Sequence, residues 1–320
     1  MKRVFLTGIT GLLGSGLAEL LLSRGYHVIA PVRQKSACTD LTHPNLKLIE
    51  GSLFDDYSEK LRMVDTVIHA AAETRQDLPR YTPYWQTNCS ATIQLFNSAH
   101  RSGVPTFIFV SSANTLGHGS EKEYGDEKKK ISAPFDRSFY ALSKLEAEKY
   151  LLANNKGMKT VIINPGFMIG PGRNQSGSNR IIRMGLRKKL LFYPPGGKSF
   201  VHVRDVTEAI RMAMEKGIDG EKYLIVNENL TYRQFFTELN QTTGRSPVMI
   251  KIPPLVLKSL GIPGDLLRRL GIHTEWCSVH MDILCTRNFY SNGKSVRELG
   301  ISYTPVSEAI HDYIKEPQRH

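Results

Sequence analysis

The sequence predicts an α/β fold in which a doubly wound parallel β-sheet is followed by a smaller, mixed C-terminal region. Three observations predict it. Short apolar runs alternate with helical patterns through the first half of the chain, which is typical of βαβ units. A glycine-rich segment directly follows the first apolar run. The second half lacks the regular alternation and is punctuated by Pro253-Pro254 and Pro263-Gly264, which indicates a different organisation.

Six apolar runs in the first half predict buried strands, because they are short and rich in β-branched and aromatic residues. They cover residues 3–7, 27–32, 46–49, 66–69, 106–110 and 160–163. Helical spacing of apolar residues lies between them, from Leu13 to Leu21 and over residues 84–101 and 138–153. Glycines 25, 103 and 157 follow these helical stretches, at the place where helices commonly end.

The second half predicts fewer elements. We expect a helix over residues 179–190, short strands over 200–203 and 222–226, and Asp205 as the cap of the helix between those strands. Thr231 and Gln234 have the spacing of a capping box, which opens a helix ending near Gly244. The chain therefore divides into a first domain over residues 1–165 and a second region over 166–320, of which 200–227 is expected to return to the first sheet.

The composition is that of an ordinary globular chain. Of its 320 residues, 41% are hydrophobic and 22% are charged, which excludes a disordered, collagen-like or coiled-coil protein. Glycines and Glu19 interrupt the apolar stretch between Val4 and Leu22, so a strand and a helix explain it better than a membrane span. Four cysteines without metal-ligand spacing predict no metal site and favour a cytoplasmic location. The net charge of +12 is explained by a lysine-rich surface, and no nucleic-acid or membrane partner is expected.

The glycine-rich segment predicts a dinucleotide site. Gly8, Gly11 and Gly14 stand three residues apart between the first strand and the first helix. Glycines allow a tight turn and let the backbone approach a ligand closely. The N-terminal end of the helix supplies free N–H groups and a positive dipole end, which suit a pyrophosphate. Thr10, Leu12 and Leu13 complete the predicted loop.

The end of the second strand favours NADP(H) over NAD(H). An acidic residue there binds the ribose 2′-hydroxyl of NAD, whereas arginine accommodates the 2′-phosphate of NADP. The sequence has Arg33 and Lys35 at this point and no acid before Asp40. Arg33 can make charge-assisted bonds to a phosphate, and Lys35 adds positive field. NAD(H) stays open as the alternative.

A Tyr-x-x-x-Lys pair supplies the predicted acid–base chemistry. Tyr140 and Lys144 lie one turn apart on a predicted helix, where the ammonium can lower the pKa of the phenol toward the neutral range. Ser112 follows the fifth strand, at the sheet edge where open α/β sheets bind ligands. The same spacing recurs in Tyr124 and Lys128, but no helix is predicted there.

These motifs together resemble the extended short-chain dehydrogenase/reductase family, within the NAD-dependent epimerase/dehydratase superfamily. The Val-Arg pair ending the second strand resembles its dihydroflavonol reductase-like branch. The resemblance implies a Rossmann fold, with a substrate-binding region in the C-terminal half. It also implies a Ser-Tyr-Lys site with Asn88 as a fourth member, and a homodimer by analogy. The cofactor residues it adds are Ser52, Leu53, Ala70, Ala71, Ala72, Pro165 and Met168, beside Tyr140 and Lys144 themselves. Ser52 stands where the family often has Asp, and Asn164 where some nucleotide-sugar enzymes have Arg.

Three functions are compatible with these residues. The favoured one is an NADP(H)-dependent reductase of a ketone or aldehyde, and the alternative is an NAD-dependent nucleotide-sugar epimerase or dehydratase. A cofactor-sensing protein without chemistry is the third, against which the intact Tyr-Lys pair argues. The substrate itself is not encoded in any motif. For its pocket we consider two sets of residues, namely the aromatics Trp276, Phe289 and Tyr193, and the basic residues Arg180, Arg183 and Arg187, expected on one helix face.

Overall fold

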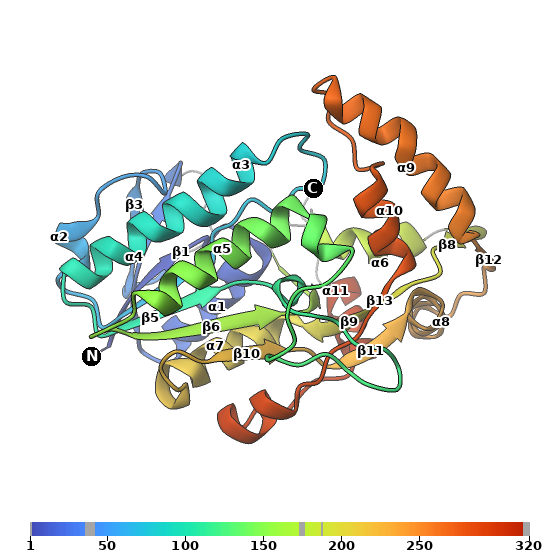
Figure 1. Cartoon of the computed structure of the whole chain (residues 1–320). Coiled ribbons are helices and arrows are strands. Elements are labelled where there is room, and N and C mark those ends of the chain that lie inside the picture. Colours follow the sequence, from blue (N-terminus) through green and yellow to red (C-terminus); the bar gives the residue numbers. More distant parts are fainter. Residues whose placement is uncertain (1, 36–41, 173–176, 187, 316–320) are drawn as a thin grey trace.

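A seven-stranded parallel sheet forms the first layer of the molecule, in the order β10-β6-β5-β4-β1-β2-β3. The structure is a computed structural model that describes residues 2–35, 42–172, 177–186 and 188–315. Figure 1 shows the sheet with helices on both of its faces, which confirms the doubly wound fold. The elements of this part are β1 (Arg3–Thr7), α1 (Leu12–Ser23), β2 (His27–Val32), β3 (Leu46–Glu50), α2 (Ser58–Leu61), β4 (Thr66–His69), α3 (Thr82–Trp85), α4 (Ala91–Arg101), β5 (Thr106–Val110), α5 (Phe139–Ala153) and β6 (Lys159–Pro165).

Alternation along the strands explains the two helix layers, because successive side chains of a strand point to opposite faces. Val4 and Leu6 of β1 pack with α1 and with α7 (Val203–Lys216) in one core. Phe5, between them, packs with α2, α4 and α5 in a second core on the other face. Both faces of the sheet are therefore buried, as a parallel sheet requires.

The second half adds two small sheets and one returning strand. The strand β9 (Gly197–His202) pairs with β7 (Phe167–Ile169), β11 (Glu228–Thr231) and β13 (Arg287–Asn288), whereas β8 (Leu190–Tyr193) pairs with β12 (Val248–Lys251). A separate core surrounds Phe200 and Phe235, whose rings stack at a centroid distance of 4.5 Å. The remaining elements are α6 (Arg180–Gly185), β10 (Lys222–Ile225), α8 (Tyr232–Thr243), α9 (Pro254–Arg269), α10 (Ser278–Cys285) and α11 (Val306–Lys315).

The stretch 200–227 is shared between the two parts of the molecule. The strand β10 joins the edge of the large sheet beside β6, and α7 packs beside α1. Residues Phe200–His202 belong instead to β9 of the smaller sheet, where they pair with β7, so this portion does not return to the first sheet. The expected boundary at residue 165 coincides with the last residue of β6.

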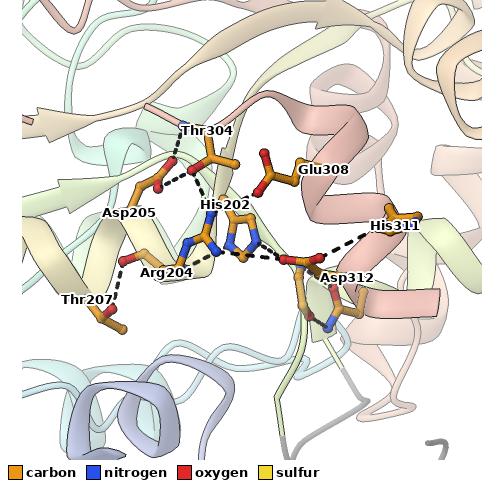
Figure 2. Close-up of polar contacts among 10 residues, drawn as sticks. His202, Arg204, Asp205, Thr207, Thr304, Glu308, His311 and Asp312 are labelled. Carbon is orange, nitrogen blue, oxygen red and sulfur yellow. Dashed lines mark hydrogen bonds and ion pairs between the residues drawn. The ribbon is translucent and has the colours of Figure 1, made fainter. Parts of the chain in front are cut away.

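A polar cluster joins α7 to the C-terminal segment (Figure 2). We expected Asp205 to cap α7, but the cap is His202, whose Nδ1 accepts from the backbone N–H of Arg204 at 3.0 Å. Asp205 lies one turn further on and accepts from the backbone N–H and the hydroxyl of Thr304, both at 2.8 Å. His202 Nε2 donates to Asp312 of α11 at 3.2 Å. These bonds hold α11 against the start of α7.

Two further local predictions have different outcomes. The capping box of Thr231 and Gln234 is present, and α8 ends before Gly244, which has a left-handed backbone. The helix expected over 179–190 is present but shorter, because α6 ends at Gly185 and β8 begins at Leu190. A side chain at Gly185 would collide with Leu239 of α8 at 2.4 Å, so a glycine lets α6 pack closely there. No helix in the described part of the chain has the length and apolar content needed to cross a membrane.

Candidate active site

The carboxyl ends of β1, β4, β5 and β6 bring the predicted site together. These four strands are parallel neighbours, so the residues that follow them meet at one edge of the sheet. Gly8, Ala70, Ser112 and Pro165 lie at or just beyond these ends. Open α/β sheets bind their ligands at this edge.

The glycine loop fits a bound pyrophosphate. Gly8 has φ +81°, and a Cβ there would lie 2.7 Å from the backbone nitrogen of Ala71. A Cβ at Gly14 would lie 2.0 Å from the carbonyl oxygen of Gly8. The helix α1 starts after Gly11 with no side-chain cap and no acid in its first turn, so neither a capping side chain nor a first-turn carboxylate competes with an anion for its first N–H groups.

The side chains of the glycine loop differ in how far they are buried. Thr10 is exposed and Leu12 is half-buried, whereas the Leu13 side chain is buried against the sheet. Leu13 can therefore reach a phosphate only through its backbone N–H. The residues present fit a dinucleotide, and the loop needs no acidic or basic side chain to bind it.

A buried hydrogen-bond chain connects the glycine loop to the helix of Asn88. His69 lies between Thr7, at 2.7 Å from Nδ1, and Thr92, at 2.9 Å from Nε2. The Thr92 hydroxyl donates to the carbonyl of Asn88 at 2.8 Å, so it accepts from His69, and Nε2 carries the proton. Burial, assisted by the charge of Lys144, lowers the pKa of His69 to about 3. His69 is thus a neutral core residue that fixes the position of Thr7, which accepts from the Ala71 N–H at 3.2 Å.

Tyr140 lies near Ser112. Ser138 caps α5 through a bond from the Ala141 N–H, which places Tyr140 in the first turn of the helix. Burial raises the pKa of Tyr140, and the nearby Ser112 side chain opposes this rise. The expected lowering of this pKa by Lys144 therefore stays a prediction.

Lys144 is fully buried one turn below Tyr140. Its Nζ donates to the carbonyl of Val110 at 2.9 Å and lies 4.6 Å from the centre of the Phe109 ring. Burial lowers the pKa of Lys144 to about 7, and the carboxylate of Glu148 works against this shift. The amine is thus held in one position beneath the site.

Asn88 positions α5 from the side. It lies in a π-helical turn, Gln86–Ser90, that joins α3 to α4 within the helix expected over 84–101. Its side chain accepts from the Glu73 N–H at 2.7 Å and donates to the Glu73 carbonyl and the Ser143 hydroxyl, both at 3.0 Å. Asn88 is completely buried, so in this structure it connects the loop after β4 with α5.

Sequence analysis missed a second buried cluster beneath Ser112. Glu148 is completely buried and forms an ion pair with Lys222 of β10. It also accepts from Asn164 and from Thr115, both at 2.7 Å. Asn164 in turn donates to the carbonyl of Ser112 at 3.0 Å. The only available signal was that Glu148 follows Tyr140 and Lys144 at helical spacing.

The residues expected around the adenosine and nicotinamide differ in accessibility. Arg33 and Lys35 are exposed at the end of β2, and the Lys35 N–H donates to Glu50 at 3.2 Å. The Ser52 hydroxyl donates to Asp55 at 3.0 Å, so Asp55 supplies a carboxylate near the position where the expected Asp is missing. The other residues named for the cofactor are half-buried, apart from the buried Pro165, and comprise Leu53, Ala70, Ala71, Ala72 and Met168.

A cavity of about 320 Å³ opens beside Tyr140. Sequence analysis missed its other walls, because they come from separate segments, including Tyr84 of α3, Arg137, Arg268 of α9 and His280 of α10. Arg137 forms an ion pair with Asp282 at 2.9 Å. Arg268 donates to the backbone carbonyls of Gln76 and Thr274. The walls are therefore held by polar contacts to neighbouring segments.

The residues suggested for the pocket from sequence lie elsewhere. Phe289 and Tyr193 are buried in the core, and Trp276 is exposed outside the cavity wall. Arg180 forms a two-pronged ion pair with Glu275, at 2.7 and 2.9 Å. Arg183 is exposed on α6, and Arg187 lies outside the described residues. Arg180 and Arg183 both lie on α6, which ends at Gly185, so a common face of all three arginines stays a prediction.

Comparison with known proteins agrees with this arrangement. The model of the NAD dependent epimerase/dehydratase family matches residues 4–227. A putative dihydroflavonol 4-reductase of Synechocystis sp. is 27% identical, over 99% of this chain and 94% of that protein. A decarboxylating sterol-4-alpha-carboxylate 3-dehydrogenase of Dictyostelium discoideum is 29% identical, over 95% of this chain and 96% of that protein.

Among solved structures, the UDP-glucuronic acid 4-epimerase of Bacillus cereus, in complex with UDP-glucuronic acid and NAD, has the same fold. Its TM-score is 0.79 at 21% identity, over 98% of this chain and 99% of that one. The predicted resemblance to extended short-chain dehydrogenases/reductases is thereby confirmed. The match of the family model to most of the chain shows that this protein belongs to the NAD-dependent epimerase/dehydratase family.

Proposed function

We propose that the protein is an NADP(H)-dependent reductase of a ketone or aldehyde. The observation that carries the proposal is the position of Tyr140, which lines the cavity near Ser112 and stands one turn from the buried Lys144. The phenol of Tyr140, the hydroxyl of Ser112 and the ammonium of Lys144 are groups that can together support reduction of a carbonyl.

In this reaction different residues of the chain bind the cofactor, orient the substrate and transfer the proton. Gly8, Gly11 and Gly14 would hold the pyrophosphate of the cofactor, which would supply the hydride. Ser112 hydrogen-bonds the substrate carbonyl oxygen and orients it toward Tyr140. Tyr140 gives its phenolic proton to that oxygen, and the cationic form of Lys144 stabilises the phenolate left behind. The buried Asn164 and Glu148 support this site through the carbonyl of Ser112.

Preference for NADP(H) rests on Arg33. Its side chain is exposed at the end of β2 and forms no ion pair with any residue in the described ranges. It is therefore free to bind a 2′-phosphate, with Lys35 nearby.

The second candidate is an NAD-dependent nucleotide-sugar epimerase or dehydratase. It is favoured by Arg137 and Arg268 in the cavity wall, because guanidinium groups bind diphosphates well. Arg137 is already paired with Asp282, so the reductase remains the primary proposal.

Nucleotide affinity tests the proposal. Any nucleotide released on denaturation is identified first, and NADPH and NADH affinities are then measured on stripped protein, followed by a carbonyl panel. Arg33→Gln is expected to weaken NADPH binding about tenfold and leave NADH binding unchanged. Arg62→Gln, an exposed arginine beyond α2, is the matched control. Tightly retained NAD, with no effect of Arg33→Gln, contradicts the proposal and favours the epimerase or dehydratase.

A further inference from the structure

The helix α9 turns an apolar face outward. Its inner side packs on α10 through Leu257, Gly261 and Gly264, and a Cβ at Gly264 would collide with the carbonyl of Trp276. In Figure 1, α9 stands at the margin of the molecule with only α10 beside it. The outward face carries the exposed side chains of Leu255, Val256, Ile262, Leu266, Leu267 and Leu270, with Ser259 among them.

The pattern is the reverse of an ordinary surface helix, whose outward face is polar. Leu255, Ile262, Leu266 and Leu270 recur at helical spacing, and their exposed fractions are 79%, 70%, 58% and 69%. Single exposed apolar residues are normal, but a continuous apolar face marks an interaction surface.

A second apolar surface, on the β8–β12 sheet, precedes the outward face of α9 in the chain. The strands β8 and β12 are paired, with Leu190 opposite Val248 and Phe192 opposite Ile250. All four side chains are exposed, so they lie on the outer face of the two-stranded sheet. Since β12 runs directly into α9, the two apolar surfaces adjoin in the chain.

The rim of this surface is basic. Residues 245–273 contain five Lys or Arg residues and one acid, Asp265, but Arg268 belongs to the cavity wall and not to this rim. The carboxylate of Asp265 accepts from the Ser278 N–H at 3.0 Å. Lys251 and Lys258 are exposed along the apolar face, Lys258 lies 3.9 Å from Asp282, and Lys189 precedes β8. The whole chain has a net charge of +12.

We propose that the outward face of α9, with the outer face of the β8–β12 sheet, docks on the surface of a membrane containing anionic lipids. An apolar face with a rim of lysines and arginines is the pattern of a helix that lies in the lipid interface, and the basic rim complements anionic headgroups. A second copy of the chain fits less well, because it would bring two basic rims together. The proposal differs from the expectation of no membrane partner and does not depend on the proposed catalytic function.

Vesicle co-sedimentation of the full chain tests this docking. Vesicles of phosphatidylcholine with phosphatidylglycerol are compared with vesicles of phosphatidylcholine alone, at low and at high salt. The double variant Ile262→Gln/Leu266→Gln is expected to bind the anionic vesicles about tenfold more weakly. The control is Met63→Gln/Ile218→Gln, since these side chains are 58% and 53% exposed away from α9 and binding should not change. Lys251→Gln/Lys258→Gln should lower binding about fivefold per lysine, and only for anionic vesicles.

Two results would overturn the proposal. One is the absence of co-sedimentation of the wild-type chain with anionic vesicles at low salt. The other is a concentration-dependent dimer that Ile262→Gln/Leu266→Gln abolishes without any vesicle binding, which would assign the face to a second copy. Loss of vesicle binding with unchanged circular dichroism in that variant supports docking, because the substituted residues are exposed and make little contribution to folding.

Discussion

The carboxyl edge of the large sheet and the α9–α10 segment both border the cavity, but they are built in opposite ways. At the sheet edge, Lys144, His69 and Asn88 are buried and each has fixed partners. Outside the cavity, α9 buries few side chains and exposes most of its apolar ones. The edge is therefore arranged before any ligand binds, whereas α9 leaves most of its apolar side chains exposed. We expect changes at the edge to affect chemistry and stability strongly, and changes on the outward face of α9 to affect neither.

The largest expected effect is on turnover. Tyr140→Phe removes the proton donor from the cavity wall, so turnover should fall about 10³-fold. Cofactor affinity and melting temperature should stay nearly constant. Tyr124→Phe removes the tyrosine of the second Tyr-x-x-x-Lys sequence, which is 49% exposed and outside any helix, and is expected to be silent. Equal losses in both variants would contradict the assignment of Tyr140.

The buried ion pair should give the next largest effect. Glu148→Gln leaves Lys222 without its carboxylate in a mostly buried position, and the expected loss of stability is about 3 kcal/mol. Urea unfolding measures it. Glu146→Gln, two residues earlier on the exposed side of the same helix, should cost less than about 1 kcal/mol. If both variants unfold at the same urea concentration, the buried cluster does not stabilise the edge.

His69 should give the sheet edge a characteristic acid sensitivity. Its pKa falls from 6.5 to about 3 on folding, so the unfolded chain binds a proton more readily between these values. Stability is therefore full above pH 6.5 and declines as the pH falls toward 3, by about 1.4 kcal/mol for each pH unit. His69→Gln should show a shallower decline in urea unfolding across this range. The control His273→Gln, beyond α9 and largely exposed, should retain the wild-type slope, and a wild-type slope in His69→Gln would refute the role of burial.

The smallest effect is expected on the outward face of α9. Leu255→Gln replaces a side chain that is 79% exposed, so stability should change by less than about 0.5 kcal/mol. Leu257→Ala, two residues further on and 6% exposed, should cost about 2 kcal/mol or more. Thermal unfolding of the pair tests whether the apolar face of α9 serves the fold. A large loss in Leu255→Gln would remove the contrast between the two regions.

Much of the large sheet was predictable because its signals are local. All six strands expected in the first half are present, since a parallel sheet demands short apolar runs and its crossovers demand helices. The glycine loop was recognisable because close backbone approach, as between Gly8 and Ala71, tolerates no side chain. Tyr140 and Lys144 were recognisable because one helical turn separates them. The π-turn at Asn88 and the end of α6 at Gly185 were missed, since both depend on packing against other helices.

The sequence by itself determined the doubly wound sheet, the glycine loop and the spacing of the Tyr-Lys pair, because each follows from residues close together in the chain. Only the tertiary structure decided which residues form the cavity wall. Tyr84, Arg137, Arg268 and His280 come from four separate segments, and no periodicity connects them. It likewise decided that Glu148 is buried and paired with Lys222, 74 residues away. Spatial neighbours of this kind are set by how the elements pack, which no local pattern records.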